Sequence, residues 1–146
     1  MIARIADILA DKGSDVVTIG STATTAEVVA LLTRHRIGAV VVVDDADVPL
    51  GIVSERDVVQ AVGRAGAEVL GTVVTEVMST DVPACTPKAR VDDVAALMTQ
   101  GRHRHVPVIV GGELLGIVSV GDVVRSQIDD LSEAAEQLRA YVAGGY

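Results

Sequence analysis

The chain has no phenylalanine, no tryptophan and a single cysteine, Cys85. Because 49% of its 146 residues are nevertheless apolar, its core must be built from valine, isoleucine, leucine and alanine. Branched aliphatic side chains favour half-buried strands, with amphipathic helices packed over them. One cysteine excludes an internal disulfide and provides no metal-ligand spacing. The length suits one compact domain or two tightly joined half-domains.

Positive charge is also scarce, since 12 lysine and arginine residues face 20 acidic residues and leave a net charge of −8. This balance argues against nucleic acid or an anionic membrane as the main partner, because phosphate groups attract clustered basic residues. A local basic cluster can still bind a small anion. No apolar run is long enough to cross a membrane, and residues 1–4 lack the features of a signal peptide, so we expect a soluble, cytoplasmic protein.

In contrast to these absences, the chain contains a clear internal repeat. The segment 51–59 returns as 116–124, and seven of these nine positions are identical. The similarity extends upstream, where 28–33 matches 94–99. A repeat of this length is usually one supersecondary unit that cannot bury its apolar face alone. We therefore expect two similar halves, with any binding site where the halves meet.

Each half is expected to contain the same order of elements, beginning with a strand and ending with a helix. The elements expected in the first half are a strand at 16–19, a helix at 24–34, strands at 39–44 and 50–54, and a helix at 55–63. Those expected in the second half are a strand at 83–86, a helix at 90–100, strands at 105–110 and 114–118, and a final helix. Short helical turns at 4–9 and 75–78 precede the halves.

Local signals place the turns and the helix starts. Thr24 and Glu27 predict a capping box in the first half, whereas Arg90 and Asp93 occupy these positions in the second and leave it without one. Residues 63–67 are the expected linker, and Gly111-Gly112 is the expected hairpin turn.

The last helix carries an apolar stripe that extends beyond the repeated unit. Its members are spaced alternately four and three residues apart, as in a helix that packs along another helix. They are Val124, Ile128, Leu131, Ala135, Leu138 and Val142. Since little of its own repeat remains to cover this stripe, we expect a homodimer contact here; packing on its own domain is the alternative.

The tandem β-α-β-β-α units, each with a Gly-Ile-Val-Ser-x-x-Asp junction at 51–57 and 116–122, resemble the CBS-domain pair, or Bateman module. The resemblance implies an α+β fold, with two repeats packed about a pseudo-twofold axis and a long C-terminal helix. It divides the chain into a first repeat with its N-terminal segment and linker at 1–66, a second repeat at 67–127 and a helical extension at 128–146.

Members of this family are sensors or regulators and not catalysts. Their two clefts often bind adenosine ligands such as AMP, ADP, ATP, NAD(H) or S-adenosylmethionine. Stand-alone pairs with a long C-terminal helix commonly dimerise, which implies a homodimer formed through the helices of the repeats and the C-terminal helix. The resemblance therefore implies a non-enzymatic regulatory module with an adenine nucleotide as ligand, no required cofactor and an unknown regulated protein. A scaffold that dimerises or binds other proteins, with empty clefts, is the alternative.

The serine and aspartate of each junction have two interpretations. Ser54 with Asp57, and Ser119 with Asp122, can simply cap the helices that follow them. In the family, however, this aspartate binds the ribose hydroxyls, while the serine and the free N–H groups of the helix start face a phosphate. The resemblance favours the second interpretation.

The densest positive cluster in the chain is 102–105, which reads Arg-His-Arg-His. Such a cluster often lies at a solvent-exposed helix C-terminus, where positive charges interact favourably with the helix dipole. In the family, a His-Arg pair before this strand contacts phosphate in the cleft whose ribose aspartate comes from the other repeat. The resemblance therefore groups His103 and Arg104 with Asp57, and Arg56 adds a third positive charge suited to phosphate. Candidate walls of this cleft, equally plausible as ordinary core, are Met78, Pro83 and Pro107.

The other cleft would contain Asp122 and Ser119, with Gly121 in place of Arg56. The residues expected on its opposite and adenine sides are Ile37, Gly38, Lys12 and Val17. Because it lacks the basic cluster, this cleft should favour a less charged ligand or stay empty.

Two other kinds of site receive little support. His103 and His105, with His35, could form a metal site, but no cysteine or acidic residue completes the set at a convincing spacing. A Ser-His-Asp hydrolase would need a nucleophile with an adjacent base, whereas both serines occupy repeated capping positions. We expect neither a metal nor catalysis.

Overall fold

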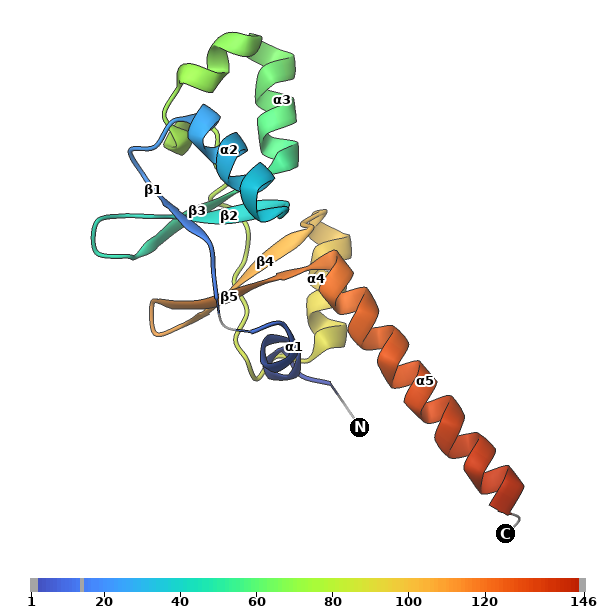
Figure 1. Ribbon diagram of the computed structural model, residues 1–146. Coiled ribbons are helices and arrows are strands. Elements are labelled where there is room, and N and C mark those ends of the chain that lie inside the picture. Colours follow the sequence, from blue (N-terminus) through green and yellow to red (C-terminus); the bar gives the residue numbers. More distant parts are fainter. Residues whose placement is uncertain (1–2, 14, 145–146) are drawn as a thin grey trace.

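The strands of this protein lie between two sets of helices (Figure 1). α2 and α3 cover one end of the molecule, and α1, α4 and the beginning of α5 cover the other. The computed structural model describes residues 3–13 and 15–144. The first half contains β1 (Thr18–Gly20), α2 (Thr25–His35), β2 (Ala39–Val43), β3 (Pro49–Ser54) and α3 (Glu55–Ala65). The second half contains α4 (Val91–Gly101), β4 (His105–Val110), β5 (Glu113–Ser119) and α5 (Val120–Gly144), while α1 (Ile5–Lys12) and the 3-10 helices η1 (Ala67–Gly71) and η2 (Val74–Glu76) precede the halves.

Both halves are built on an antiparallel hairpin with the same register. β2 pairs with β3 so that Ala39 lies opposite Ser54, and β4 pairs with β5 so that His105 lies opposite Ser119. The predicted turn at Gly111-Gly112 is confirmed: both residues have positive φ, 58° and 81°, which glycine adopts without a steric penalty. Each junction serine therefore lies at the same end of its sheet. The α+β fold with tandem repeats and a long C-terminal helix is confirmed.

Three local predictions differ from the structure. The strand expected at 83–86 is reduced to one parallel bridge between Cys85 and Val108, so the second sheet has two strands and the first has three. α3 continues into the expected linker and ends at Ala65, because the helix is interrupted at Gly66, which has a φ of 77°. At α2, Thr24 accepts a hydrogen bond from the Glu27 N–H, but the reciprocal half of the capping box is not formed.

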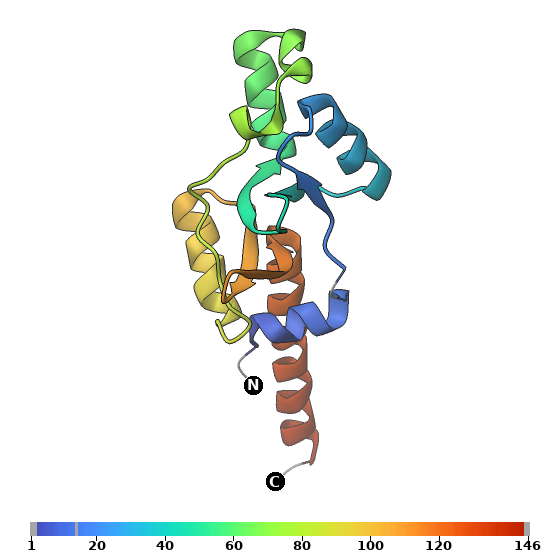
Figure 2. The same ribbon diagram turned by 90° about the vertical axis from the view of Figure 1, so that its left-hand side faces the viewer.

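The segment that precedes each repeat contributes to the core of the other half. Ile5 of α1 is fully buried with Val106 and Val118 of the second hairpin. Val74 of η2 is fully buried with Val53 in the first half. Isolated bridges between Arg4 and Arg90 and between Thr24 and Val73 hold these segments in equivalent positions, and Figure 2 shows α1 crossing beneath the second hairpin. The two halves are therefore interleaved.

The outer part of α5 extends away from the rest of the molecule (Figures 1 and 2). Val123, near its beginning, is buried in the second core. Leu131, Leu138 and Val142 further along are 71%, 63% and 68% exposed. The predicted stripe therefore forms an uncovered apolar face in a single chain, because the repeat to which it belongs ends before it.

Candidate functional site

The junction at the start of α3 places a carboxylate in a fixed position. The Ser54 N–H donates to Asp57 Oδ2 at 2.9 Å, and the Asp57 N–H donates to Ser54 Oγ at 3.2 Å, which is a complete capping box. The Ser54 hydroxyl also lies 3.1 Å from Oδ2. Ser79, in the connection after η2, donates to the other oxygen, Oδ1, at 3.0 Å. Three polar groups, the Ser54 N–H, the Ser54 hydroxyl and the Ser79 hydroxyl, therefore orient the Asp57 side chain before any ligand is present.

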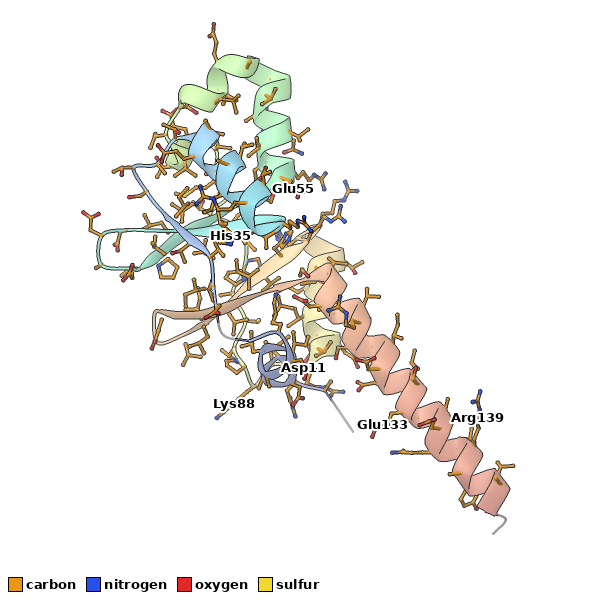
Figure 3. The ribbon with its side chains drawn as sticks, viewed as in Figure 1. Asp11, His35, Glu55, Lys88, Glu133 and Arg139 are labelled. Atoms are coloured by element: carbon orange, nitrogen blue, oxygen red, sulfur yellow. The ribbon has the colours of Figure 1, made fainter. Side chains whose placement is uncertain are left out.

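Asp57 lines a cavity of about 490 Å³, here named the first cavity, where the two halves meet. The start of α3 supplies Ser54, Glu55, Arg56, Asp57 and Gln60; the segment before β4 supplies Arg102, His103, Arg104 and His105; and Gly38, Ile52, Ser79, Asp81 and Val82 complete the lining. The structure thus brings together the five residues expected to bind ribose and phosphate. Figure 3 shows Glu55 at the start of α3, close to nitrogen-bearing side chains beyond the end of α4.

The first cavity combines the carboxylates of Glu55, Asp57 and Asp81 with three guanidinium groups. Arg56, Arg102 and Arg104 are exposed side chains on its rim, and His103 is half-buried between them. A Cβ at Gly101 would lie 2.5 Å from His103 Cδ2, so glycine there leaves room for the imidazole. Guanidinium groups can bind a phosphate through two parallel hydrogen bonds. The cavity can therefore hold an anionic group close to a carboxylate that accepts hydrogen bonds from hydroxyl groups.

Asp122, at the equivalent position in the second half, has a different partner. Its Oδ2 accepts from the Ser119 N–H at 2.9 Å, and the Asp122 N–H donates to Ser119 Oγ at 3.1 Å, so the same capping contacts form. The Lys12 ammonium of α1 lies 2.7 Å from Asp122 Oδ2. Burial raises the pKa of Asp122, but the hydrogen bonds from Lys12 and Ser119 outweigh it and leave the pKa below its usual range. Asp122 is therefore an ionised, internally paired group.

A second cavity, of about 310 Å³, lies on the opposite side of the junction between the halves. Of the residues predicted there, it is lined by Lys12, Val17, Ile37, Gly38 and Ser119. Asp122 instead lines a neighbouring groove that Lys12 shares. A Cβ at Gly121 would make only an ordinary contact, 3.6 Å, with Ser119 Oγ. Arg36, held in the left-handed region with φ of 54°, adds a cation that the sequence interpretation missed.

The two cavities share a wall made of Gly38 and His105. A Cβ at Gly38 would lie 3.1 Å from His105 Nε2, so the imidazole packs directly against the glycine backbone. Burial, and then the charge of Arg104, lower the pKa of His105; Lys12 lowers it further, whereas the carboxylates of Glu55 and Asp122 oppose the change. Gly38, expected only in the second cleft, therefore contributes to both.

Three predicted wall residues lie elsewhere among the residues that the structure describes. Met78 packs beneath β3, where a Cβ at Gly51 would lie 2.9 Å from its sulfur. Pro107 is buried in β4 and lines a separate cavity of about 170 Å³. Pro83 is half-buried, and its neighbour Val82 lines the first cavity in its place. Cavity residues beside the repeated motif are easier to predict than residues of the cavity walls, because the position of the wall residues depends on how the connection at 77–84 packs.

Sequence reasoning also missed Ser79, which belongs to no motif. Its place is set by a bridge to Ile52 of β3, with the Ser79 N–H donating to the Ile52 carbonyl at 2.8 Å. Aligning the segments that precede the two repeats gives no signal for it, because Met78 beneath Gly51 matches Leu9 beneath Gly116, and Ser79 therefore matches Ala10.

Other chemistry finds little support in the described part of the chain. Within residues 3–13 and 15–144, no three histidine, cysteine, aspartate or glutamate side chains are grouped so that they could hold a metal ion. Burial raises the pKa of the Cys85 thiol to about 11, which keeps it protonated and a poor nucleophile near neutral pH. None of the helices in these ranges has the length and apolar character needed to cross a membrane.

Comparison with known proteins identifies the family. The model of the CBS domain matches residues 5–64 and 74–129. A crystal structure of a CBS-domain-containing protein from Agrobacterium tumefaciens is 44% identical and superposes with a TM-score of 0.83, over 87% of this chain and 95% of the other. The CBS domain-containing protein YhcV of Bacillus subtilis is 33% identical over 82% of this chain and 84% of its own length.

Of two further relatives, one is longer than this chain and the other was solved with bound ligands. A mitochondrial CBS domain-containing protein of Arabidopsis thaliana, CBSX3, is 36% identical over 79% of this chain, which spans only 58% of that relative. The CBS domain pair of protein MJ0100, whose structure contains 5′-methylthioadenosine and S-adenosyl-L-methionine, has the same fold, with a TM-score of 0.79 at 24% identity over 89% of this chain and 99% of the other. Since both of its halves match the CBS domain and two relatives above 30% identity are CBS-domain-containing proteins, the chain belongs to the CBS-domain family as a tandem pair.

Proposed function

We propose that this CBS-domain pair is a non-enzymatic regulatory module that binds an adenosine nucleotide in its first cavity. The observation that carries the proposal is the lining of that cavity, where the Asp57 carboxylate, the guanidinium groups of Arg56 and Arg104 and the imidazole of His103 surround one space of about 490 Å³. A volume of this size falls in the range of about 300–1,000 Å³ that is typical of small-molecule sites.

The ribose and the phosphate of a nucleotide each have a matching group in the first cavity. Asp57 is oriented by its capping contacts and by Ser79, so it can accept hydrogen bonds from ribose hydroxyls without reorganisation. Arg104 and Arg56 lie on the rim, where a phosphate can bind while remaining partly solvated. The bound 5′-methylthioadenosine and S-adenosyl-L-methionine of the MJ0100 pair support an adenosine ligand for this fold.

A ligand screen by thermal unfolding tests this proposal. AMP, ADP, ATP, NADH and S-adenosylmethionine should be added separately, because a ligand that binds only the folded chain stabilises it by about 2.7 kcal/mol at one hundred times its dissociation constant. At least one of the five should raise the melting temperature. If none does, a ligand-free scaffold becomes the better description.

We further infer that two chains associate, with the outer part of α5 at the contact. The exposed apolar face that includes Ile128, Leu131 and Leu138 supports this inference, because faces of this kind usually mark interfaces. Twofold symmetry would bring the same face of two chains together and cover both. The same face is also what favours the scaffold as the second candidate function. The cytoplasmic location expected from the sequence stays a prediction.

A further inference from the structure

The two junction carboxylates have different neighbours, although their capping contacts are the same. Asp57 is contacted by the neutral hydroxyl of Ser79, at 3.0 Å. Asp122 is contacted by the ammonium of Lys12, at 2.7 Å. The Ser79 hydroxyl can rotate away and leave the carboxylate free for a ligand. The Lys12 ammonium pairs with the negative charge of Asp122, so a ligand hydroxyl would have to compete with it for that carboxylate.

A second difference lies at one matching place in the segments that precede the two halves. Leu9 of α1 packs beneath Gly116, and Met78 packs beneath Gly51, so these two residues occupy equivalent positions. Three residues further along, the second half has Lys12 and the first half has Asp81, which lines the first cavity. The pseudo-symmetric position therefore carries a cation in one half and an anion in the other.

Lys12 is held at two points and covers its partner. Its ammonium donates to the Ile117 carbonyl at 2.8 Å as well as to Asp122. The side chain of Lys12 is 39% exposed, whereas that of Asp122 is only 12% exposed. The ammonium thus contacts the same oxygen, Oδ2, that accepts from the Ser119 N–H, on a carboxylate that has little exposure to solvent.

The surroundings also favour Lys12 over an anionic ligand. Beyond the ion pair lies an acidic groove of about 250 Å³, which Lys12 and Asp122 line together. Its other charged residues are Asp7, Asp11, Asp129, Asp130 and Glu133, with Arg125 as a further cation. Figure 3 shows Asp11 on α1 and Glu133 on α5. Carboxylates attract the ammonium and repel a phosphate, so displacing Lys12 with a nucleotide is unfavourable.

We propose that Lys12 determines how many nucleosides the chain binds, because its ammonium occupies Asp122 Oδ2 and closes the second cleft to ribose. The second cleft here means the second cavity together with the neighbouring groove that Asp122 lines. The inference rests on the proposed function, in that it takes Asp57 and Asp122 as the carboxylates that bind ribose. The chain then binds one nucleotide, at Asp57, and the second cleft opens only when Lys12 leaves.

The test uses adenosine as the probe and Asp57→Ala as the background, so that binding at the second cleft is seen alone. Isothermal calorimetry should show that adenosine binding to Asp57→Ala is weakened at least about ten-fold relative to wild type or is lost. The double variant Asp57→Ala/Lys12→Met should bind about one adenosine per chain, because methionine keeps a long apolar side chain and lacks the ammonium. Adding Asp122→Asn to that variant should weaken binding at least about ten-fold, since a charge-assisted hydrogen bond is lost.

A matched control is available in Lys88, which is exposed and is the only other lysine in the chain. Asp57→Ala/Lys88→Met makes the same change in net charge and should bind no more adenosine than Asp57→Ala. Thermal unfolding of each variant verifies that it is folded. We expect the Lys12 variants to fold, because the Lys12 side chain is partly exposed.

Two results would overturn the inference. One is a folded Asp57→Ala/Lys12→Met variant that binds no more adenosine than Asp57→Ala. The other is an Asp57→Ala variant that already binds adenosine and loses it with Asp122→Asn, because the cleft would then be open beside Lys12. The proposed function fails in a different way. It is wrong if the wild-type protein binds no adenosine ligand, or if the Asp57→Ala variant binds the ligand as tightly as wild type does.

Discussion

The substitution Asp57→Ala distinguishes between two roles of this residue, capping of α3 and binding of a nucleotide. The substitution removes a carboxylate that accepts from the Ser54 N–H, the Ser54 hydroxyl and the Ser79 hydroxyl. Capping contacts of this kind contribute about 0.5–2 kcal/mol. Because Asp57 is only half-buried, water can replace part of what is lost, and we expect the free energy of unfolding to fall by about 1–2 kcal/mol. The melting temperature should fall by about 3–6 °C.

The expected effect on binding is larger. Hydrogen bonds between ribose hydroxyls and an ionised carboxylate contribute about 1.5–3 kcal/mol. Their loss corresponds to a weakening of AMP binding of about 10- to 150-fold. Calorimetric titration with AMP measures this change, and denaturant unfolding of the same samples measures the stability.

Asp122→Ala provides the matched control, because Asp122 makes the same capping contacts with Ser119. This variant should also melt at a lower temperature, the more so because it loses the ion pair with Lys12, but it should bind AMP as wild type does. If Asp57→Ala binds AMP normally while melting lower, Asp57 is only a helix cap. Equal losses of AMP affinity in both variants would point to a general weakening of the fold.

Three further predictions concern phosphate, assembly and pH. Arg104→Ala should weaken AMP binding about ten-fold or more but change adenosine binding little, because only AMP carries the phosphate; equal losses in calorimetry would assign Arg104 to the fold. Leu131→Glu/Leu138→Glu should shift the mass measured by light scattering toward a monomer, whereas an unchanged dimer mass would move the interface to the helices of the repeats, and a wild-type monomer at micromolar concentration would end the dimer prediction. Burial lowers the pKa of His105 from its usual 6.5, so below about pH 6.5 the unfolded chain binds more protons than the native one, and the free energy of unfolding should decrease as the pH falls through this window. His105→Gln should flatten that decrease in denaturant titrations between pH 7 and about pH 5, and a slope equal to that of wild type would contradict it.

The repeated parts of the fold could be predicted because local chemistry determines them. The junction serines and aspartates form the expected capping contacts, and the glycine pair at 111–112 makes the expected turn. The strand expected at 83–86 was wrong because strand pairing depends on which edge the connection reaches, and it reaches only the single bridge at Cys85.

The candidate site was predictable to the same extent. Residues within or beside the motif, such as Arg56 and His103, line one cavity as expected, although their roles stay predictions. Ser79 and the ion pair between Lys12 and Asp122 could not be found by spacing. Both contacts join segments far apart in the chain, and only the exchange of the preceding segments between the halves brings them together.

This interleaving also determines how the chain can be divided. A fragment of residues 67–146 lacks Ile5, which is fully buried in the second core, and a fragment of residues 1–66 lacks Val74, which is fully buried in the first. Neither repeat is therefore an autonomous folding unit, and the whole chain should unfold in one cooperative transition. Mixed in solution, the two fragments should complement each other, because each supplies the element that the other needs. A duplicated gene for a single repeat would thus have encoded a self-associating half-protein before the two copies were joined.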